Sequence, residues 1–227
     1  MRAFVAGATG LTGRSVVEAA VARGAEAVAH VRPDSSRLAE WRARFEGLGA
    51  RVDSHPWSPE GMAGAMAEHL PTHVFCLLGT TRKRARAGEG DYRTVDVGLT
   101  VMLIDAVRAA GLDRTRIVYL SSLGADKPRG AYLHARADVE AHLRASGLPF
   151  TIARPSFIVG ARDQARIGEA VGAAAADAPL KLMGLLGGRR MADRLRSIDG
   201  PTLAAGLVRA AFDPAAEGAV LDSADLR

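Results

Sequence analysis

A glycine-rich turn between a strand pattern and a helix pattern is the feature that most constrains this chain. The apolar run Phe4-Val5-Ala6 leads into Gly7-Ala8-Thr9-Gly10-Leu11-Thr12-Gly13, and a helix pattern begins at Ser15. Glycines at this spacing allow a tight turn, close approach of the backbone to a pyrophosphate, and close packing of the helix against the sheet. The helix N-terminus then faces the anion. The order of these segments predicts a dinucleotide-binding loop, and a purely structural glycine turn is the alternative.

The residue that follows the second strand pattern bears on which dinucleotide binds. Ala27-Val28-Ala29-His30-Val31 ends at Arg32. NAD-binding folds usually place an acid about 20 residues beyond the glycines, whereas an arginine there suits the 2′-phosphate of NADP. Asp34 follows Pro33 between two arginines, and we interpret it as a turn residue or a helix cap. The sequence therefore favours NADP(H) over NAD(H).

Size and composition indicate one globular domain. The chain has 227 residues, of which 48% are hydrophobic, and this length allows a sizeable core. There is no apolar run of about 18 residues and no signal-peptide pattern, so we expect a cytoplasmic protein that does not enter a membrane. The single cysteine, Cys76, lies in a strand pattern, which predicts a buried thiol rather than a nucleophile.

The net charge of +5 raises the question of nucleic-acid binding. The one dense basic cluster, Arg82-Lys83-Arg84-Ala85-Arg86, has no interleaved aromatic residues and no nucleic-acid motif around it. We therefore expect no nucleic-acid partner and interpret the cluster as a solvated loop. The alternative is that this loop attracts an anionic cofactor or substrate.

Strand and helix patterns alternate through the first two thirds of the chain. Strands are expected near 2–7, 26–31, 50–54, 73–78, 116–121 and 149–154, and helices near 12–23, 36–46, 59–69, 91–110 and 132–146. This alternation predicts an α/β fold, a Rossmann-like doubly wound parallel sheet with its ligand edge at the strand C-termini. We expect residues 1–227 to form a single NAD(P)-binding domain, in which 155–198 make up most of a small C-terminal helical substrate lobe. A last helix over 201–212 and a short apolar segment over 219–221 follow.

Serine and tyrosine residues with a distinctive spacing follow the fifth strand pattern. Ile117-Val118-Tyr119-Leu120 ends in Ser121-Ser122, and a predicted helix opens at Tyr132. This pattern resembles the short-chain dehydrogenase/reductase superfamily. The resemblance implies that Ser122, or Ser121 as a fallback, holds the substrate carbonyl and that Tyr132 is the general acid/base. In that family a lysine four residues after the tyrosine lowers the tyrosine pKa and binds the nicotinamide ribose.

Arg136 occupies the position of that lysine. A phenol with a pKa of about 10 needs a nearby cation to act at neutral pH, and the i, i+4 spacing places both side chains on one helical face. Arginine keeps the charge but has a bulkier, planar head that never gives up its proton, so tyrosine activation can survive while the ribose contact is in doubt. The alternative is that Tyr132 covers apolar surface and Arg136 is solvated.

A closer resemblance is to an atypical branch of this superfamily, similar to the HIV Tat-interacting protein, the nitrogen-repression regulators and the flavin/biliverdin reductase. It covers nearly the whole chain and rests on the segments 7–14, 76–82, 92–96, 120–127, 132–140 and 154–158. It implies a pyrophosphate site at Gly7, Thr9, Gly10, Leu11, Thr12 and Gly13, a 2′-phosphate site at Arg32 and Arg37, a ribose contact at Leu78 and Gly79, and a nicotinamide contact at Pro155, Ser156, Phe157 and Ile158.

The third strand departs from that branch, in which Gly-Asp often faces the adenine. The matching stretch here reads His55-Pro56-Trp57. Packing of His55 or Trp57 on the adenine ring and burial of Trp57 in the core are equally open. The histidines show no metal-ligand spacing, because Pro71 separates His69 from His73, and no metal site is predicted.

The sequence thus predicts an NADP(H)-binding oxidoreductase that transfers hydride between nicotinamide and a small carbonyl or alcohol. The alternative is a regulatory or scaffold protein that senses NADP(H) without turnover. The expected partners are a nicotinamide dinucleotide and a small-molecule substrate of unknown identity, and a homodimer stays open.

Overall fold

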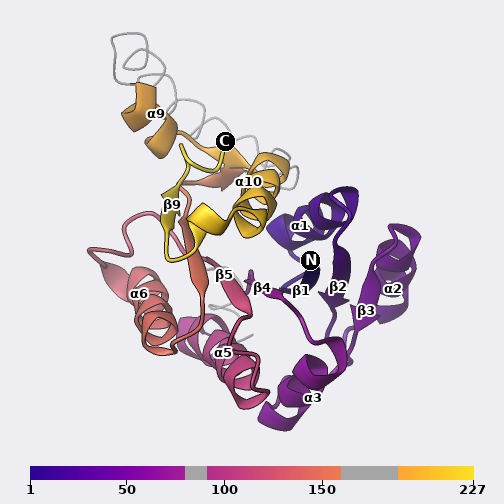
Figure 1. Ribbon diagram of the computed structural model, residues 1–227. Helices are drawn as coiled ribbons and strands as arrows, with labels where there is room; N and C mark the ends of the chain where they lie inside the picture. The colour runs from indigo at the N-terminus through magenta and orange to yellow at the C-terminus, as the bar shows by residue number, and fades with distance from the viewer. Residues whose placement is uncertain (80–90, 160–188) are drawn as a thin grey trace.

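A parallel seven-stranded sheet forms the centre of the computed structural model, which describes residues 1–79, 91–159 and 189–227 (Figure 1). The strand order is β3-β2-β1-β4-β5-β6-β9, and every neighbouring pair is parallel. The strands are β1 (Arg2–Ala6), β2 (Glu26–His30), β3 (Arg51–Asp53), β4 (His73–Cys76), β5 (Arg116–Leu120), β6 (Phe150–Arg154) and β9 (Val220–Asp222). This arrangement confirms the predicted Rossmann-like fold.

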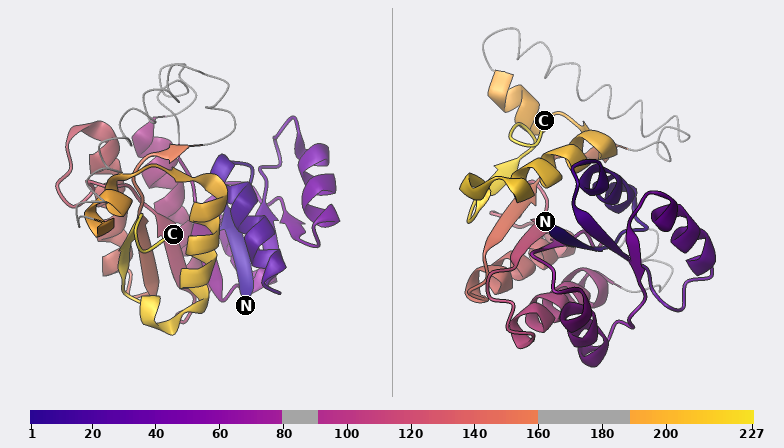
Figure 2. Two further views of the ribbon diagram at one scale, coloured as in Figure 1. Left: turned by 90° about the horizontal axis from the view of Figure 1, so that it is seen from above. Right: turned by 45° about the vertical axis from the view of Figure 1, so that its right-hand side comes forward.

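Helices cover both faces of this sheet. One face carries α1 (Leu11–Ala22), α2 (Leu38–Gly47) and α10 (Gly200–Phe212), and the other carries α3 (Pro59–His69), α5 (Leu99–Ala109) and α6 (Gly130–Ala145). Figure 2 shows α10 alongside α1. Side chains alternate between the two cores along β1, since Ala3 and Val5 pack under α1 whereas Phe4 and Ala6 pack toward α3 and α5.

The helix expected over 91–110 consists of two parts. A π-helix, η1 (Tyr92–Gly98), precedes α5, and its N-terminus is capped by Asp91, which accepts a hydrogen bond from the Thr94 amide at 2.8 Å. The wider turn places Asp96 inside the protein, where its side chain is fully buried. Single-turn π-helical segments are frequent at functional sites, and this one places a buried carboxylate before the start of α5.

The C-terminal part of the chain adds elements that the sequence pattern did not predict. The short apolar segment near 219–221 becomes the seventh strand, β9, which pairs with β6. A second, two-stranded sheet joins β7 (Ile158–Val159) to β8 (Ile198–Asp199). The remaining elements are α9 (Arg189–Leu195) and the short helix η3 (Pro214–Ala216).

Two sequence predictions fall partly or wholly outside the described residues. Most of the predicted substrate lobe, over 160–188, lies there, and so does the basic cluster Arg82–Arg86. Among the helices of the described ranges, none combines the length and the apolar character needed to cross a bilayer. Cys76 is fully buried, as predicted, and burial raises the pKa of its thiol to about 12.

Candidate functional site

The loop between β1 and α1 has a backbone that requires glycine. Gly7 has a φ of 85°, and its carbonyl accepts a hydrogen bond from the Gly10 amide at 2.9 Å. A Cβ at Gly13 would lie 2.1 Å from the Gly7 oxygen, so α1 can start this close to β1 only with glycine there. Gly10 is the N-cap of α1 and has no side chain to occupy the first amides, which leaves them available to an anion.

A pocket of about 260 Å³ opens beside this loop at the C-terminal ends of the strands. It lies between β1 and β4, where the strand order reverses and open α/β sheets bind their ligands. Six residues predicted to bind the cofactor line it: Gly7, Thr9, Gly10, Arg32, Leu78 and Gly79. The sequence analysis missed His30, Val31, Ser35, Leu77, Val95 and Leu99, which also line it.

The two arginines predicted for the 2′-phosphate have different surroundings. Arg32 lines the pocket, and its Nη1 atom lies 3.4 Å from an Asp34 oxygen in a pair whose side chains are 55% and 71% exposed. Such an exposed pair is weak, so the guanidinium is free to turn to an anion. Arg37 is not among the lining residues. It donates to Glu40, with 2.6 Å between Nε and Oε2, and its guanidinium lies 4.7 Å from the centre of the Trp41 ring.

Two aromatic side chains, His30 and Trp57, line the side of the pocket near β3. Trp57 is half-buried and lines the pocket, and its ring meets the His30 ring edge-on at 4.7 Å between centroids. His55 is not a lining residue, because its ring turns to the Asp53 carboxylate. Of the two residues considered for the adenine, the pocket includes Trp57. His30 could have been noticed from its place at the end of β2.

Arg136 is buried rather than solvated, with a side chain only 7% exposed, so the alternative of a solvated arginine is wrong. Its Nη2 atom lies 2.7 Å from an Asp96 oxygen, and its Nη1 atom donates to the carbonyls of Leu78 and Leu120 at 3.2 and 3.1 Å. Nη1 also lies 3.3 Å from the Tyr119 hydroxyl. These contacts tie α6 to η1 and to the ends of β4 and β5.

Burial and neighbouring groups act in opposite directions on this guanidinium. Burial alone would lower the pKa of Arg136, but Tyr119, Tyr132 and Asp96 outweigh it and raise the pKa above its ordinary value. Arg136 is therefore a permanent cation at the ligand edge. A Cβ at Gly79 would lie 2.7 Å from Nη2, so the absence of a side chain at Gly79 makes room for the arginine head.

Tyr132 lies directly over this cation. The guanidinium carbon is 5.1 Å from the centre of the Tyr132 ring, within the range of a cation–π contact, and Tyr92 of η1 packs edge-on against the ring at 5.4 Å. Tyr132 and Ser122 are both half-buried, and neither lines the 260 Å³ pocket. Arg136 connects the two regions, because Leu78, which accepts from it, and Gly79, which makes room for it, both line the pocket.

Ser121 has a structural partner. Its hydroxyl donates to Glu140 Oε1 at 2.6 Å, and Arg154 donates to both oxygens of the same carboxylate at 2.9 and 2.6 Å. Burial opposes ionisation of Glu140, but the hydrogen bonds from Arg154 and Ser121 outweigh it and lower the pKa of the carboxyl. Ser121 thereby joins β5 to α6 and β6.

We expect Glu140→Gln to lower the free energy of unfolding at neutral pH by about 3 kcal/mol, because it removes one partner of a buried ion pair. That corresponds to a fall in Tm of about 6–12 °C. The folded-state pKa of Glu140 is below its ordinary value of 4.5, so the ionic contribution is present above that pH and is lost as the pH falls through the lowered pKa. Urea unfolding of both proteins between pH 7 and 3 should therefore show a difference that shrinks in acid, and a constant difference would contradict this assignment.

The remaining predicted cofactor residues lie in two places. Leu11, Thr12 and Gly13 form the first turn of α1, where Leu11 packs against Gly200. Pro155, Ser156, Phe157 and Ile158 form the segment from β6 into β7. In it, the Ser156 amide donates to the Ser223 hydroxyl at 2.8 Å and Phe157 is 83% exposed. This segment lies at the C-terminal edge of the sheet, and it does not line the pocket.

The sequence matches a known family over most of this fold. A family model described as NAD(P)H-binding matches residues 7–177, which include the glycine loop, Arg136 and Tyr132. The chain belongs to this NAD(P)H-binding family. The match does not single out the branch similar to the HIV Tat-interacting protein.

Curated relatives of this NAD(P)H-binding chain include a fungal protein and a bacterial enzyme. The protein named fmp52, mitochondrial, from Emericella nidulans is 30% identical over 172 residues, which cover 73% of this chain and 70% of that protein. A ketoreductase of Stigmatella aurantiaca, named for a 4-hydroxy-2-methyl-3-oxo-4-farnesyl-3,4-dihydroquinoline-1-oxide substrate, is 30% identical over 188 residues, covering 73% of this chain and 52% of that enzyme.

Solved structures share the fold. A candidate NAD-dependent epimerase/dehydratase from Bacillus halodurans superposes with a TM-score of 0.71 at 18% identity, covering 100% of this chain and 98% of that one. The triphenylmethane reductase of Citrobacter sp. in complex with NADP(H) superposes with a TM-score of 0.65 at 16% identity, covering 97% and 68% of the two chains.

Proposed function

We propose that this NAD(P)H-binding protein is an NADPH-dependent reductase that delivers hydride to a small carbonyl compound, or removes it from the corresponding alcohol. The observation that carries this proposal is the buried Arg136 guanidinium under the Tyr132 ring, at the ligand edge of the sheet. A relative named as a ketoreductase and a fold neighbour solved with NADP(H) support the same reaction class. We also propose that the protein acts in the cytoplasm, although the fungal relative is named mitochondrial, and that it can form a homodimer.

Each residue of the proposed site has a separable task. The cofactor, when bound, supplies the hydride. Ser122 donates a hydrogen bond to the substrate carbonyl, and Tyr132 gives its phenolic proton to the oxygen as the alcohol forms. Arg136, whose guanidinium carbon lies 5.1 Å from the centre of the Tyr132 ring, supplies a positive charge beside the phenolate that remains. Asp96 and the Leu78 and Leu120 carbonyls hold that cation in place.

Binding and turnover together test this function. We expect NADPH to bind in a calorimetric titration and to be oxidised steadily when aldehydes and ketones from a broad panel are added. Tight binding of NADPH without turnover on any member of the panel would instead support the alternative, a protein that senses NADP(H). Failure of NADPH, NADP+, NADH and NAD+ to bind in the same titration would overturn both functions.

Arg32→Ala is expected to remove the preference for the phosphorylated cofactor. A charge-assisted hydrogen bond to phosphate contributes about 1.5–3 kcal/mol, so the affinity for NADPH should fall about 10- to 150-fold while that for NADH is nearly unchanged. Calorimetry with NADPH and NADH measures both affinities. Arg37→Ala is the matched control, since Arg37 is held by Glu40 and Trp41 away from the pocket. Equal losses for the two cofactors in Arg32→Ala would contradict a 2′-phosphate contact.

A further inference from the structure

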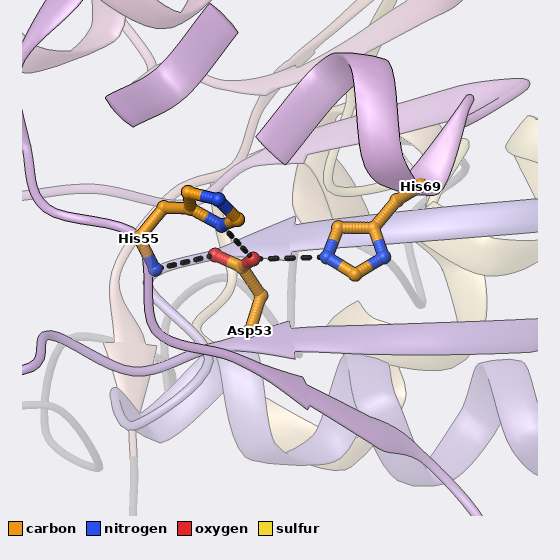
Figure 3. Close-up of side chains that lie close together, drawn as sticks. All are labelled: Asp53, His55 and His69. Atoms are coloured by element: carbon orange, nitrogen blue, oxygen red, sulfur yellow. Dashed lines mark hydrogen bonds and ion pairs between the residues drawn. The ribbon is translucent and has the colours of Figure 1, made fainter. Parts of the chain in front are cut away.

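The Asp53 carboxylate contacts two histidines beside the proposed cofactor pocket. Asp53 ends β3, His55 follows it, and His69 is the last residue of α3 (Figure 3). Asp53 Oδ1 lies 2.7 Å from Nδ1 of His55 and 2.9 Å from Nε2 of His69. The two ring nitrogens and the carboxylate oxygen all lie within 4.8 Å of one another. None of the three residues lines the pocket, so this cluster is separate from the proposed cofactor site.

The ligand types and spacing suit a transition-metal ion. Zn²⁺ binds imidazole nitrogen and carboxylate oxygen at about 2.0–2.2 Å in a tetrahedral arrangement, which separates neighbouring ligand atoms by about 3.3 Å. Each nitrogen needs to move away from the shared oxygen by about half an ångström to reach that spacing. The two nitrogens, which lie within 4.8 Å of each other, must come to the same spacing. His55 lies on a loop and its side chain is 32% exposed, so it can move and gives an ion access from solvent.

The surroundings supply the remaining requirements of such a site. Asp53 and His69 are almost completely buried, with side chains 2% and 3% exposed, which fixes two ligands. The second carboxylate oxygen of Asp53 accepts from the His55 amide at 3.2 Å and lies 3.7 Å from Nε2 of His30, so it stays oriented by outer groups. A Glu68 oxygen lies 3.7 Å from Nε2 of His69, within reach of a fourth ligand position.

We propose that Asp53, His55 and His69 bind a divalent transition-metal ion such as Zn²⁺, with water or Glu68 at the fourth position. His55 binds through Nδ1 and His69 through Nε2, each in its neutral form. The proton now on each of these nitrogens moves to the other ring nitrogen. In His69 that atom, Nδ1, is buried and has no hydrogen-bond partner within the described part of the chain, so the shift of the proton breaks no hydrogen bond there. The ion ties the end of β3 to the end of α3.

Titration of the untagged protein with Zn²⁺ tests this site. We expect one equivalent to bind in calorimetry, and a Co²⁺ complex to show the visible absorption of a tetrahedral site. Saturating Zn²⁺, at about 100 times the dissociation constant, should raise Tm by about 5–10 °C. His55→Ala should weaken binding at least tenfold and remove the Co²⁺ spectrum. His55 is the residue to change first because its side chain is partly exposed, so we expect the His55→Ala variant to fold and a loss of Zn²⁺ binding to report on the site.

His142→Ala is the matched control. Nε2 of His142 lies 2.8 Å from an Asp105 oxygen, so this surface pair reproduces one His–Asp contact of the cluster, and residues 1–79, 91–159 and 189–227 offer it no third ligand. We expect the His142→Ala variant to bind Zn²⁺ as tightly as the unmodified protein does. His69→Gln provides a second variant from within the cluster. The proposal is overturned if the unmodified protein binds no Zn²⁺ at millimolar concentration, or if His55→Ala and His69→Gln both bind Zn²⁺ as tightly as the unmodified protein. Neither result depends on whether NADPH binds.

Discussion

Tyr132→Phe is expected to lower kcat for NADPH-dependent carbonyl reduction by about 10²–10⁴-fold, the usual contribution of a positioned general acid. The change removes one oxygen atom and keeps the ring, so the contacts of that ring with Arg136 and Tyr92 should persist. Affinity for NADPH should be unaffected, because Tyr132 does not line the pocket at the glycine loop. Steady-state kinetics with the best substrate of the panel, together with calorimetry, separates the two quantities.

Tyr92→Phe is the matched control for this experiment. The ring centre of Tyr92, a residue of η1, lies 5.4 Å from that of Tyr132, and both side chains are half-buried. Removing the Tyr92 hydroxyl therefore tests whether any phenol in this place can donate the proton. We expect its kcat to stay within a few-fold of the unmodified protein. If Tyr132→Phe kept full activity, or if Tyr92→Phe alone abolished it, the assignment of Tyr132 as proton donor would be wrong.

Arg136→Met is expected to cost about 3–5 kcal/mol of folding free energy, because it removes the guanidinium that lies 2.7 Å from the buried Asp96 carboxylate. The carbonyls of Leu78 and Leu120 lose a donor in the same change. A fall in Tm of about 6–20 °C follows for a chain of this size. Thermal and urea unfolding of the variant, followed by circular dichroism, measure this loss.

A double variant separates loss of the ion pair from loss of packing. Asp96→Asn in the Arg136→Met background neutralises the buried carboxylate that has lost its contact with the guanidinium, so we expect the double variant to be more stable than Arg136→Met alone. Arg136→Lys keeps the charge but has one compact ammonium in place of the planar fork that reaches Asp96 and two carbonyls. It should therefore be intermediate in stability. Equal stability of Arg136→Met and the unmodified protein would show that this arginine does not hold α6 to the sheet.

The sequence predicted the parts of this protein that depend on local pattern. The Gly7–Gly13 turn, the alternation of strands with helices and the buried position of Cys76 all follow from neighbouring residues, and the structure confirms them. The segment over 219–221 was recognised as apolar, but nothing local showed that it extends the sheet beside β6. Its strand has only three residues, which is too short for a clear alternating pattern.

The chemistry of the site depended on contacts between distant positions, and these were the least predictable. Arg136 was singled out by its spacing from Tyr132, but its partner Asp96 lies in a segment expected to be an ordinary helix. Asp53 and His69 are 16 residues apart on different elements, so no helical or strand spacing brings them together. The packing of α3 on the sheet face that carries Phe4 and Val28 brings these two side chains together, and packing of that kind leaves no periodic signal.

The anchoring of α6 has a consequence for changing the specificity of such a protein. Tyr132, Arg136 and Glu140 are spaced four residues apart on one face of that helix, and the last two fasten it to the ends of β4, β5 and β6. The helix can neither roll nor slide without breaking both attachments. The attachments of α6 to the sheet thus fix the orientation of the Tyr132 phenol. To change which substrate is accepted, we would therefore redesign segments that α6 does not hold in place, such as the one from β6 into β7.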